Sequence, residues 1–491
     1  MAIYVADAIM SSGKTEAAIH FINSSPAEKR FLFITPFLSE CDRIINSCHD
    51  RHFKAPTERG NRTKGIDLQN LLKMKKNIAT THALFLLHIH ELSDLIKEGE
   101  YTLIQDEALP LLGESDLSEL AIGKDDIPFL LEHGIINKDT SNKVTFPHDT
   151  YNGSMFQPLQ EACQTMNMYY NNTVLFEELH TEIFGWFMDV YILTYLFKYS
   201  IQRYVFDIHR LEYTFIGVEK TDGHYQFTDH ITTPEYSREY SSRIHIADGE
   251  INDIGNSHTS LSHSWFERQC AIEKKRQDNS KKNETDTTTG KKEKTAARTE
   301  LQKLGSHIES FFKRDCKADN DAMKELCLWT VFKNAENLVN THSHKSRFVV
   351  FNLKASNDYR NKKYLAYCVN VFLNPVLINF LQERGTTVND EGYALSEMIQ
   401  WIWRSAIRNE TDVIIVYVPS SRMRTLLQAW LEELQNGGHG DEEHIFERAK
   451  ELMRLMQEKA KENKGKKNSG NRKTGSSAGR GKKLPTARNH P

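Results

Sequence analysis

A phosphate-binding pattern lies close to the start of the chain. It consists of Ser11, Ser12, Gly13, Lys14 and Thr15. In such a loop, successive backbone N–H groups point at phosphate oxygens, and the following helix presents its positive end. The lysine reaches the β- and γ-phosphates of a nucleotide, and the hydroxyl residue binds Mg²⁺. The pattern therefore predicts a site for ATP and Mg²⁺, with Thr15 as one metal ligand.

The loop departs from the usual pattern G-x-x-x-x-G-K-[ST] at its first position, which is Ala8. Alanine is tolerated at the exit of a strand if its φ angle is negative, because only a positive φ requires glycine. Gly13 is the more important residue, since it stands directly before Lys14, where backbone and phosphate approach closely. We therefore expect a working loop in spite of Ala8.

Two adjacent carboxylates supply the second part of the predicted site. Asp106 and Glu107 follow a mostly apolar run at 101–104. An ATPase needs a carboxylate at a strand end to hold magnesium and a further group to orient water. We assign these roles to Asp106 and Glu107, respectively. Alone, the pair would be explained better as a cap of the next helix, but together with Lys14 it favours an ATPase.

A third group of candidates lies far along the chain in "QWIWRSAIR". Gln400, Arg404 and Arg408 are spaced at i, i+4 and i+8, which predicts one shared helix face. A face with two arginines can deliver positive charge to a γ-phosphate from a second domain. The alternative is an exposed basic helix that pairs with acidic side chains.

Two further arginines, Arg422 and Arg424, follow an apolar stretch at 412–420. Arginine binds phosphate in a bidentate geometry, so both are candidates for contact with a nucleic-acid backbone. Salt bridges with Glu432 and Glu433 are an equally good explanation.

The elements that position these residues follow an α/β rhythm of short apolar runs and amphipathic segments. A hairpin is expected around Asp222-Gly223. The expected strands are 2–8, 30–37, 77–82, 101–107 and 189–197, followed by 243–248, 347–355 and 412–420. Two α/β domains in series explain this order.

Changes in composition along the chain indicate the boundaries of the domains. We expect a first domain at 1–200, a hairpin and connector at 201–242, a second domain at 243–435, and a helical then disordered tail at 436–491. The segment 271–299 has almost no large apolar residues and is expected to form a surface insertion within the second domain.

Charge and cysteine content limit the class of protein. The chain has 491 residues and a net charge of −3, yet eleven Lys or Arg and one Glu lie between Lys459 and Arg488. A basic tail predicts a polyanionic partner, although such a tail can also simply aid solubility. The seven cysteines contain no C-x-x-C pair, which favours a reducing cytoplasm over disulfides or structural zinc. No run is long and apolar enough for a membrane helix.

The order of these motifs resembles superfamily-two DEAD/DEAH-box helicases. The resemblance includes "ITPF", "TTHALF", "QDEAL" and "ILTYLF", and "QWIWRSAIR" matches the sixth helicase motif with Trp403 in place of glycine. It implies two tandem RecA-like domains, with Thr194 coupling hydrolysis to movement. By position, the residues implied to contact nucleic acid are Thr35, Pro36, Thr81 and His82.

The stretch from Asn352 to Pro375 is similar to helicase-type proteins of tailed phages. This resemblance implies that Lys354, Ser356 and Asn357 contact a nucleic-acid strand. The sequence as a whole predicts an ATP-dependent helicase or translocase acting on nucleic acid, with single-stranded or forked DNA favoured and phage replication proteins as further partners. The alternatives are a phage packaging ATPase with a nuclease domain and a non-catalytic ATP-binding helicase loader.

Overall fold

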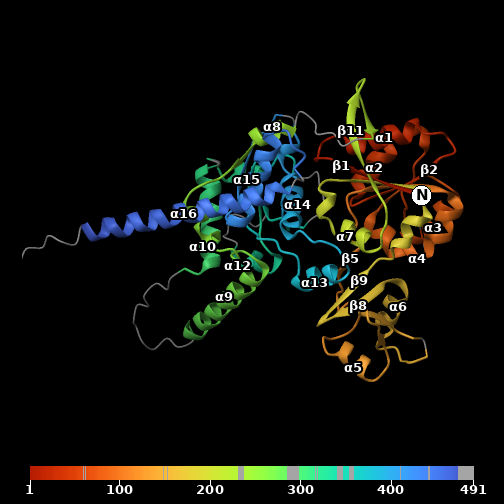
Figure 1. The fold of residues 1–491 in the computed structure, drawn as a ribbon, viewed down its shortest axis with the longest axis horizontal. Helices are drawn as coiled ribbons and strands as arrows, with labels where there is room; N and C mark the ends of the chain where they lie inside the picture. Colours follow the sequence, from red (N-terminus) through yellow and green to blue (C-terminus); the bar gives the residue numbers. More distant parts are fainter. Residues whose placement is uncertain are drawn as a thin grey trace, which may run out of the picture.

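The computed structural model describes residues 1–58, 60, 62–147, 149–151, 153–229, 237–284, 298–315, 317, 319–339, 347–352, 359–409, 411–440 and 443–473. Within this part of the chain, two parallel sheets form the centres of two α/β domains, called domain 1 and domain 2 below (Figure 1). The predicted fold class is confirmed. None of the helices described here combines the length and apolar character needed to span a membrane.

Domain 1 contains a sheet that, in the described residues, has seven strands in the order β12-β11-β1-β10-β4-β2-β3. All neighbours are parallel except the hairpin pair β11 and β12. The strands are β1 (Ala2–Asp7), β2 (Arg30–Thr35), β3 (Ile78–Thr81), β4 (Tyr101–Asp106), β10 (Asp189–Thr194), β11 (Thr214–Thr221) and β12 (His224–Thr228).

Helices cover both faces of this sheet. On β2, Phe31 and Phe33 belong to the core under α1 and α2, while Leu32 and Ile34 belong to the core under α3, α4 and α7. A strand buried on both faces is apolar at successive positions, which is why it appeared as a continuous run. The helices are α1 (Lys14–Ser24), α2 (Leu38–Ser47), α3 (Lys64–Lys73), α4 (His82–Gly99) and α7 (Ile201–Ile208).

An antiparallel subdomain, which the sequence did not predict, lies between β4 and β10. Its strand order is β5-β9-β8-β7-β6, and its own apolar core is centred on residues such as Leu130 and Leu159. The elements are β5 (Leu112–Glu114), α5 (Asp126–Glu132), β6 (Asn137–Lys138), β7 (Lys143–Thr145), α6 (Gln157–Thr165), β8 (Asn167–Asn171) and β9 (Val174–Glu178). It projects from domain 1 at the bottom of Figure 1.

Domain 2 is built on a parallel sheet of order β13-β16-β15-β14. Its strands are β13 (Ile244–Ile246), β14 (Cys327–Thr330), β15 (Tyr364–Tyr367) and β16 (Ile414–Tyr417). Its helices are α8 (Ser237–Arg243), α9 (His263–Glu284), α10 (Glu300–Ser310), α11 (Asn320–Leu326), α12 (Glu336–Val339), α14 (Asp390–Ile402), α15 (Ser421–Gln435) and α16 (His444–Lys473). Between β15 and α14, helix α13 (Pro375–Glu383) packs instead in the core of domain 1.

Four predicted segments differ in detail. The strand expected at 347–355 is not formed in its described part, 347–352, where Phe348 makes an isolated bridge with Trp329. The hairpin around Asp222 exists, but it is more than a connector, because β11 pairs with β1 and so extends the sheet of domain 1. The expected surface insertion is helical as far as Glu284, and 285–297 lie outside the described residues. The helical part of the predicted tail, α16, continues to Lys473, and 474–491 are likewise outside the described residues.

Candidate active site

The predicted phosphate-binding loop connects β1 to α1. Gly13 has a φ of 87° and Ser11 a φ of 65°, while Ala8 is not among the residues with positive φ. Alanine therefore suits its position, as expected. The Ala8 N–H donates to the carbonyl of Thr194 over 3.1 Å, which ties the start of the loop to the end of β10.

Lys14 is the first residue of α1 and is buried, with 9% of its surface exposed. Its ammonium donates to the carbonyls of Ala8 at 2.5 Å and Ile9 at 3.1 Å. Burial lowers the pKa of Lys14, and the carboxylates of Glu107 and Asp106 act in the opposite direction. The loop thus holds its own cation at the point where a phosphate would bind.

Asp106 and Glu107 lie at the carboxyl end of β4, separated from β1 by β10. Asp106 accepts a hydrogen bond from the Thr35 hydroxyl at 3.1 Å. Burial raises the pKa of Asp106 to about 7, and the neighbouring Glu107 acts in the same direction. Glu107 has a φ of 67°, a conformation that non-glycine residues adopt rarely and that recurs at functional sites.

A cavity of ≈ 280 Å³ brings these groups together, and we call it the first cavity. The carboxyl ends of β1, β2 and β4 supply most of its wall, as expected for parallel α/β sheets. Arg360 and Arg408 reach it from domain 2. Its lining includes Ser11, Gly13, Lys14, Thr15, Pro36, Asp106 and Glu107. Ser12 is buried beside them.

The prediction of one helix face for Gln400, Arg404 and Arg408 is wrong. Helix α14 ends at Ile402, and a short 3-10 turn at Ala406–Arg408 changes the direction of the chain. All three side chains nevertheless line one cavity of ≈ 300 Å³, the second cavity, which shares Glu107 and Arg408 with the first.

Arg404 is buried, with 2% of its surface exposed, and burial lowers its pKa to about 10. Its Nη1 donates to the Phe351 carbonyl at 3.4 Å. Burial also lowers the pKa of Arg408, and the carboxylate of Glu107 acts against this effect. Arginines this far from water interact more strongly with charge than they would on a surface.

The four residues of domain 1 that were expected to contact nucleic acid make contacts within the protein. Thr35 is fully buried and holds Asp106, and Pro36 lines the first cavity. Thr81 caps the start of α4 by accepting from the N–H of Leu84 at 3.3 Å, and His82 is buried. Of these residues, Pro36 lines the first cavity and Thr35 holds Asp106, whereas Thr81 and His82 belong to the start of α4. Lys354, Ser356 and Asn357 lie outside the described residues.

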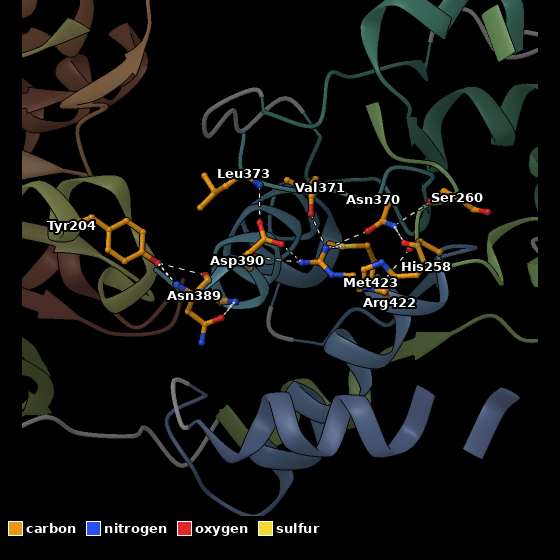
Figure 2. A network of polar contacts seen from close by, with 12 residues as sticks. Tyr204, His258, Ser260, Asn370, Val371, Leu373, Asn389, Asp390, Arg422 and Met423 are labelled. Atoms are coloured by element: carbon orange, nitrogen blue, oxygen red, sulfur yellow. Dashed lines mark hydrogen bonds and ion pairs between the residues drawn. The ribbon is translucent and has the colours of Figure 1, made fainter. Parts of the chain in front are cut away.

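Arg422 and Arg424 are structural, and their assignment to a nucleic-acid surface is wrong. Arg422 is 2% exposed, pairs with Asp390 at 2.7 Å and donates to the Val371 carbonyl at 2.7 Å (Figure 2). Arg424 donates to the carbonyl of Val418 at 2.8 Å. Both guanidinium groups are used inside domain 2, so neither faces a bound strand.

Thr194 is buried at the end of β10, and its neighbour Tyr195 makes the contact with domain 2. The Tyr195 hydroxyl accepts from the indole N–H of Trp430 at 3.0 Å and donates to the His439 carbonyl at 2.8 Å. Asp7, at the end of β1, accepts from the N–H groups of Leu196 and Phe197 in the same loop. The loop therefore joins the β1 strand to the second domain.

Sequence reasoning assigned no role to several residues of the first cavity, among them Tyr225 and Arg360. Tyr225 comes from β12, and its ring lies so close to Gly13 that an added Cβ there would be 2.3 Å from it. The Asp-Gly turn marked the hairpin but not its position beside the loop. Arg360 follows residues 353–358, which are outside the described part of the chain; it lies in the helicase-type stretch from Asn352 to Pro375, but no role was assigned to it.

Comparisons with known proteins place the chain in a family. A family model described as the YonV C-terminal Rossmann-like domain matches residues 238–431. An XPD chain in its apo form has 12% identity and a TM-score of 0.43, covering 88% of this chain and 95% of its own, a likeness too low to carry an argument. The SPbeta prophage-derived uncharacterized protein YonV of Bacillus subtilis (strain 168) is 34% identical over 443 residues, 88% of this chain and 98% of YonV. With identity at this level over nearly all of YonV, the chain belongs to the YonV family.

Proposed function

We propose that this protein hydrolyses ATP at the interface of its two α/β domains and uses the reaction to move along nucleic acid. The composition of the first cavity carries the proposal. Lys14, Asp106 and Glu107 line it from domain 1, and Arg408 lines it from domain 2. A nucleotide bound there would contact both domains, so its hydrolysis would change how strongly they associate.

The residues of the loop fit a nucleotide with its metal ion. The buried Ser12 hydroxyl has no hydrogen-bond partner among the described residues, and Lys14 donates only to loop carbonyls that a phosphate can replace. Asp106, whose pKa is raised to about 7, is a carboxyl that a divalent cation would keep ionised. Thr15 and Asp106 would hold Mg²⁺, which neutralises charge on the terminal phosphates.

The proposed reaction needs few groups. Water attacks the terminal phosphorus, the bond to the ADP oxygen breaks, and phosphate and a proton leave. Glu107 orients the water and accepts its proton. Lys14 and Arg408 offset the charge of the transferring group, while Gln400 and Arg404 act from the second cavity beside Glu107.

The proposed substrate along which the protein moves is nucleic acid, with single-stranded or forked DNA favoured. Three features support it: the basic tail after Lys459, the helicase-type stretch that contains Lys354, Ser356 and Asn357, and the prophage origin of the relative YonV. Asn352, the first residue of that stretch, lines the second cavity together with Glu107, so nucleic acid bound at Asn352 would lie close to Glu107. Phage replication proteins in the host cytoplasm are the proposed setting.

The test is the rate of ATP hydrolysis with and without single-stranded DNA or RNA. Wild type should hydrolyse ATP faster when nucleic acid is present, and Lys14→Ala should be inactive. Arg408→Ala should bind nucleotide normally and lose about 10³-fold in turnover. Arg448→Ala, which removes exposed ion pairs on α16, is the matched control and should behave as wild type. Equal rates for wild type and Lys14→Ala in every condition would refute the proposal.

A further inference from the structure

The hairpin of β11 and β12 lies on one side of the phosphate-binding loop. In the sheet of domain 1, β11 and β12 continue from β1 in one direction, and β10 and β4 follow it in the other. The loop after β1 therefore has the hairpin on one side and Asp106, the last residue of β4, on the other. Figure 1 shows the hairpin beside α1, on which β12 packs. Within the described chain, Tyr225 is the residue that the hairpin contributes to the wall of the first cavity.

The proposed roles of the loop determine the direction of a bound nucleotide. The terminal phosphate would lie beside Asp106 and Glu107, because these residues hold Mg²⁺ and orient the attacking water. The N–H groups of the loop and Lys14 would bind the phosphates next to it. The nucleoside would then leave the loop on the side opposite to Asp106, which is the side of the hairpin. The first part of the protein that a base meets there is Tyr225.

The ring of Tyr225 is held directly against the loop. It lies so close to Gly13 that no β-carbon fits between them. On the neighbouring strand, Lys220 pairs with Tyr225 and places its ammonium 5.5 Å from the centre of the ring. The side chain is nevertheless only half-buried and lines the cavity. Tyr225 therefore offers a positioned aromatic surface at the nucleoside end of the site, and aromatic surfaces of this kind stack on bases.

The wall of the first cavity offers few groups that could read the edge of a base. Asn and Gln carry a donor and an acceptor side by side, which suits the edge of adenine, but neither is among the described residues of this wall. Arg43, which does line it, is already paired with Glu16 at 2.6 Å and with Glu40 at 3.0 Å. Stacking tolerates different bases, because every base has a π-face. The composition of the wall therefore favours recognition by stacking over recognition by hydrogen bonds.

We propose that the base of the bound nucleotide stacks on Tyr225, and that the protein therefore accepts nucleoside triphosphates with little discrimination between adenine and guanine. The inference rests on the proposed function, since it assigns the nucleoside end of the same site. It also gives Gly13 a second role: a side chain at this position would displace the ring on which the base stacks.

The experiment measures binding of ADP, GDP and pyrophosphate by isothermal titration calorimetry in the presence of Mg²⁺. These ligands lack the terminal phosphate that is cleaved, and pyrophosphate lacks the base. Wild type should bind ADP and GDP with affinities within about fivefold of each other. Tyr225→Ala should weaken the binding of both by about tenfold and leave pyrophosphate binding unchanged. Tyr225→Phe, which keeps the ring, should restore the binding of ADP.

Phe227→Ala is the matched control. Phe227 lies two residues further along β12, on the same face of the hairpin, and packs against the same apolar core as Tyr225. It lines neither cavity. Its removal loosens the hairpin in a similar way, so ADP should bind to Phe227→Ala as tightly as to wild type.

The outcomes separate this inference from the proposed function. ADP binding that is equally strong in wild type and Tyr225→Ala, or an equal loss of pyrophosphate binding in Tyr225→Ala, would overturn the stacking role even if wild type hydrolyses ATP. A preference of wild type for ADP over GDP above about a hundredfold would overturn the tolerance of the base, and this comparison needs no variant that must fold. If wild type binds none of the three ligands, the proposed function and the inference both fail.

Discussion

The hydroxyl of Tyr195 in domain 1 and the indole of Trp430 in domain 2 form a hydrogen bond of 3.0 Å across the domain boundary. The same hydroxyl donates to the His439 carbonyl. Tyr195 is the residue after Thr194, whose carbonyl binds the N–H of Ala8 at the start of the loop. Two consecutive residues of domain 1 therefore contact different parts of the protein: Thr194 binds the loop that follows β1, and Tyr195 binds domain 2.

Tyr195→Phe should lower the free energy of unfolding by about 1–3 kcal/mol, because it leaves the Trp430 N–H and the His439 carbonyl without their partner. Urea denaturation measures the effect. A double-mutant cycle tests the contact itself. The single variants Tyr195→Phe and Trp430→Phe and the double variant should give a coupling energy of about 0.5–3 kcal/mol. Strictly additive effects of the two changes would contradict a direct interaction.

Ala8→Gly should restore the usual loop pattern without improving nucleotide binding. Ala8 already has an unstrained φ and donates to Thr194, so glycine gains nothing and adds backbone freedom to the unfolded chain. We expect a loss of stability of about 0.4–1 kcal/mol and an unchanged Kd for a fluorescent ATP analogue. Binding that becomes ten times tighter would show that Ala8 impairs the loop.

Asp106→Asn should stabilise the ligand-free protein at pH 8 while abolishing Mg²⁺-dependent nucleotide binding. The pKa of Asp106 is raised from 3.8 to about 7 in the fold, so the folded state favours the neutral carboxyl. The penalty is absent below the unfolded pKa, grows as pH rises, and is complete above about 7. Thermal melts of both proteins from pH 3.5 to pH 8 should therefore diverge with pH, and parallel curves would contradict the raised pKa.

Arg422→Ala should destabilise domain 2 by about 3–5 kcal/mol, since it leaves Asp390 and the carbonyl of Val371 without their donor. Arg448→Ala removes an exposed pair with Glu432 and should change stability by less than about 1 kcal/mol. Denaturation followed by tryptophan fluorescence compares the two. Folded Arg422→Ala protein that loses affinity for DNA with no loss of stability would restore this residue to a nucleic-acid surface.

Local patterns in the sequence were sufficient for the parts of the site that come from one segment. The loop around Lys14 and the pair at Asp106 are short motifs at strand ends, and parallel strands place such ends at one edge. Arg408 also lines the first cavity, but the helix that was expected to contain Arg408 ends at Ile402. No glycine or proline marks that end, so the sequence gives no signal there.

Features that depend on distant partners could not be predicted. Arg422 lies in the polar stretch "SSRMR", and its burial depends on partners that are distant in the sequence, Asp390 and the carbonyl of Val371. The antiparallel subdomain was missed because its strands are short and lack a run of apolar residues. Tyr225 was unassigned because the place of a hairpin within a sheet depends on pairing with β1, which its own residues do not specify.

The chain crosses twice between the two cores around α13. Val371 packs in the core of domain 2, whereas Leu373 and Phe380 pack in the core of domain 1, and by Ala394 the chain is again in the core of domain 2. Helix α13 thus belongs mechanically to domain 1, although domain 2 elements flank it in sequence.

The two crossings on either side of α13 are joined to each other. The carboxylate of Asp390 accepts from the Leu373 N–H at 2.7 Å and from Arg422 (Figure 2). The two crossings are therefore held together at one hydrogen bond, so α13 stays packed on domain 1 while both of its connections to domain 2 leave from the same place.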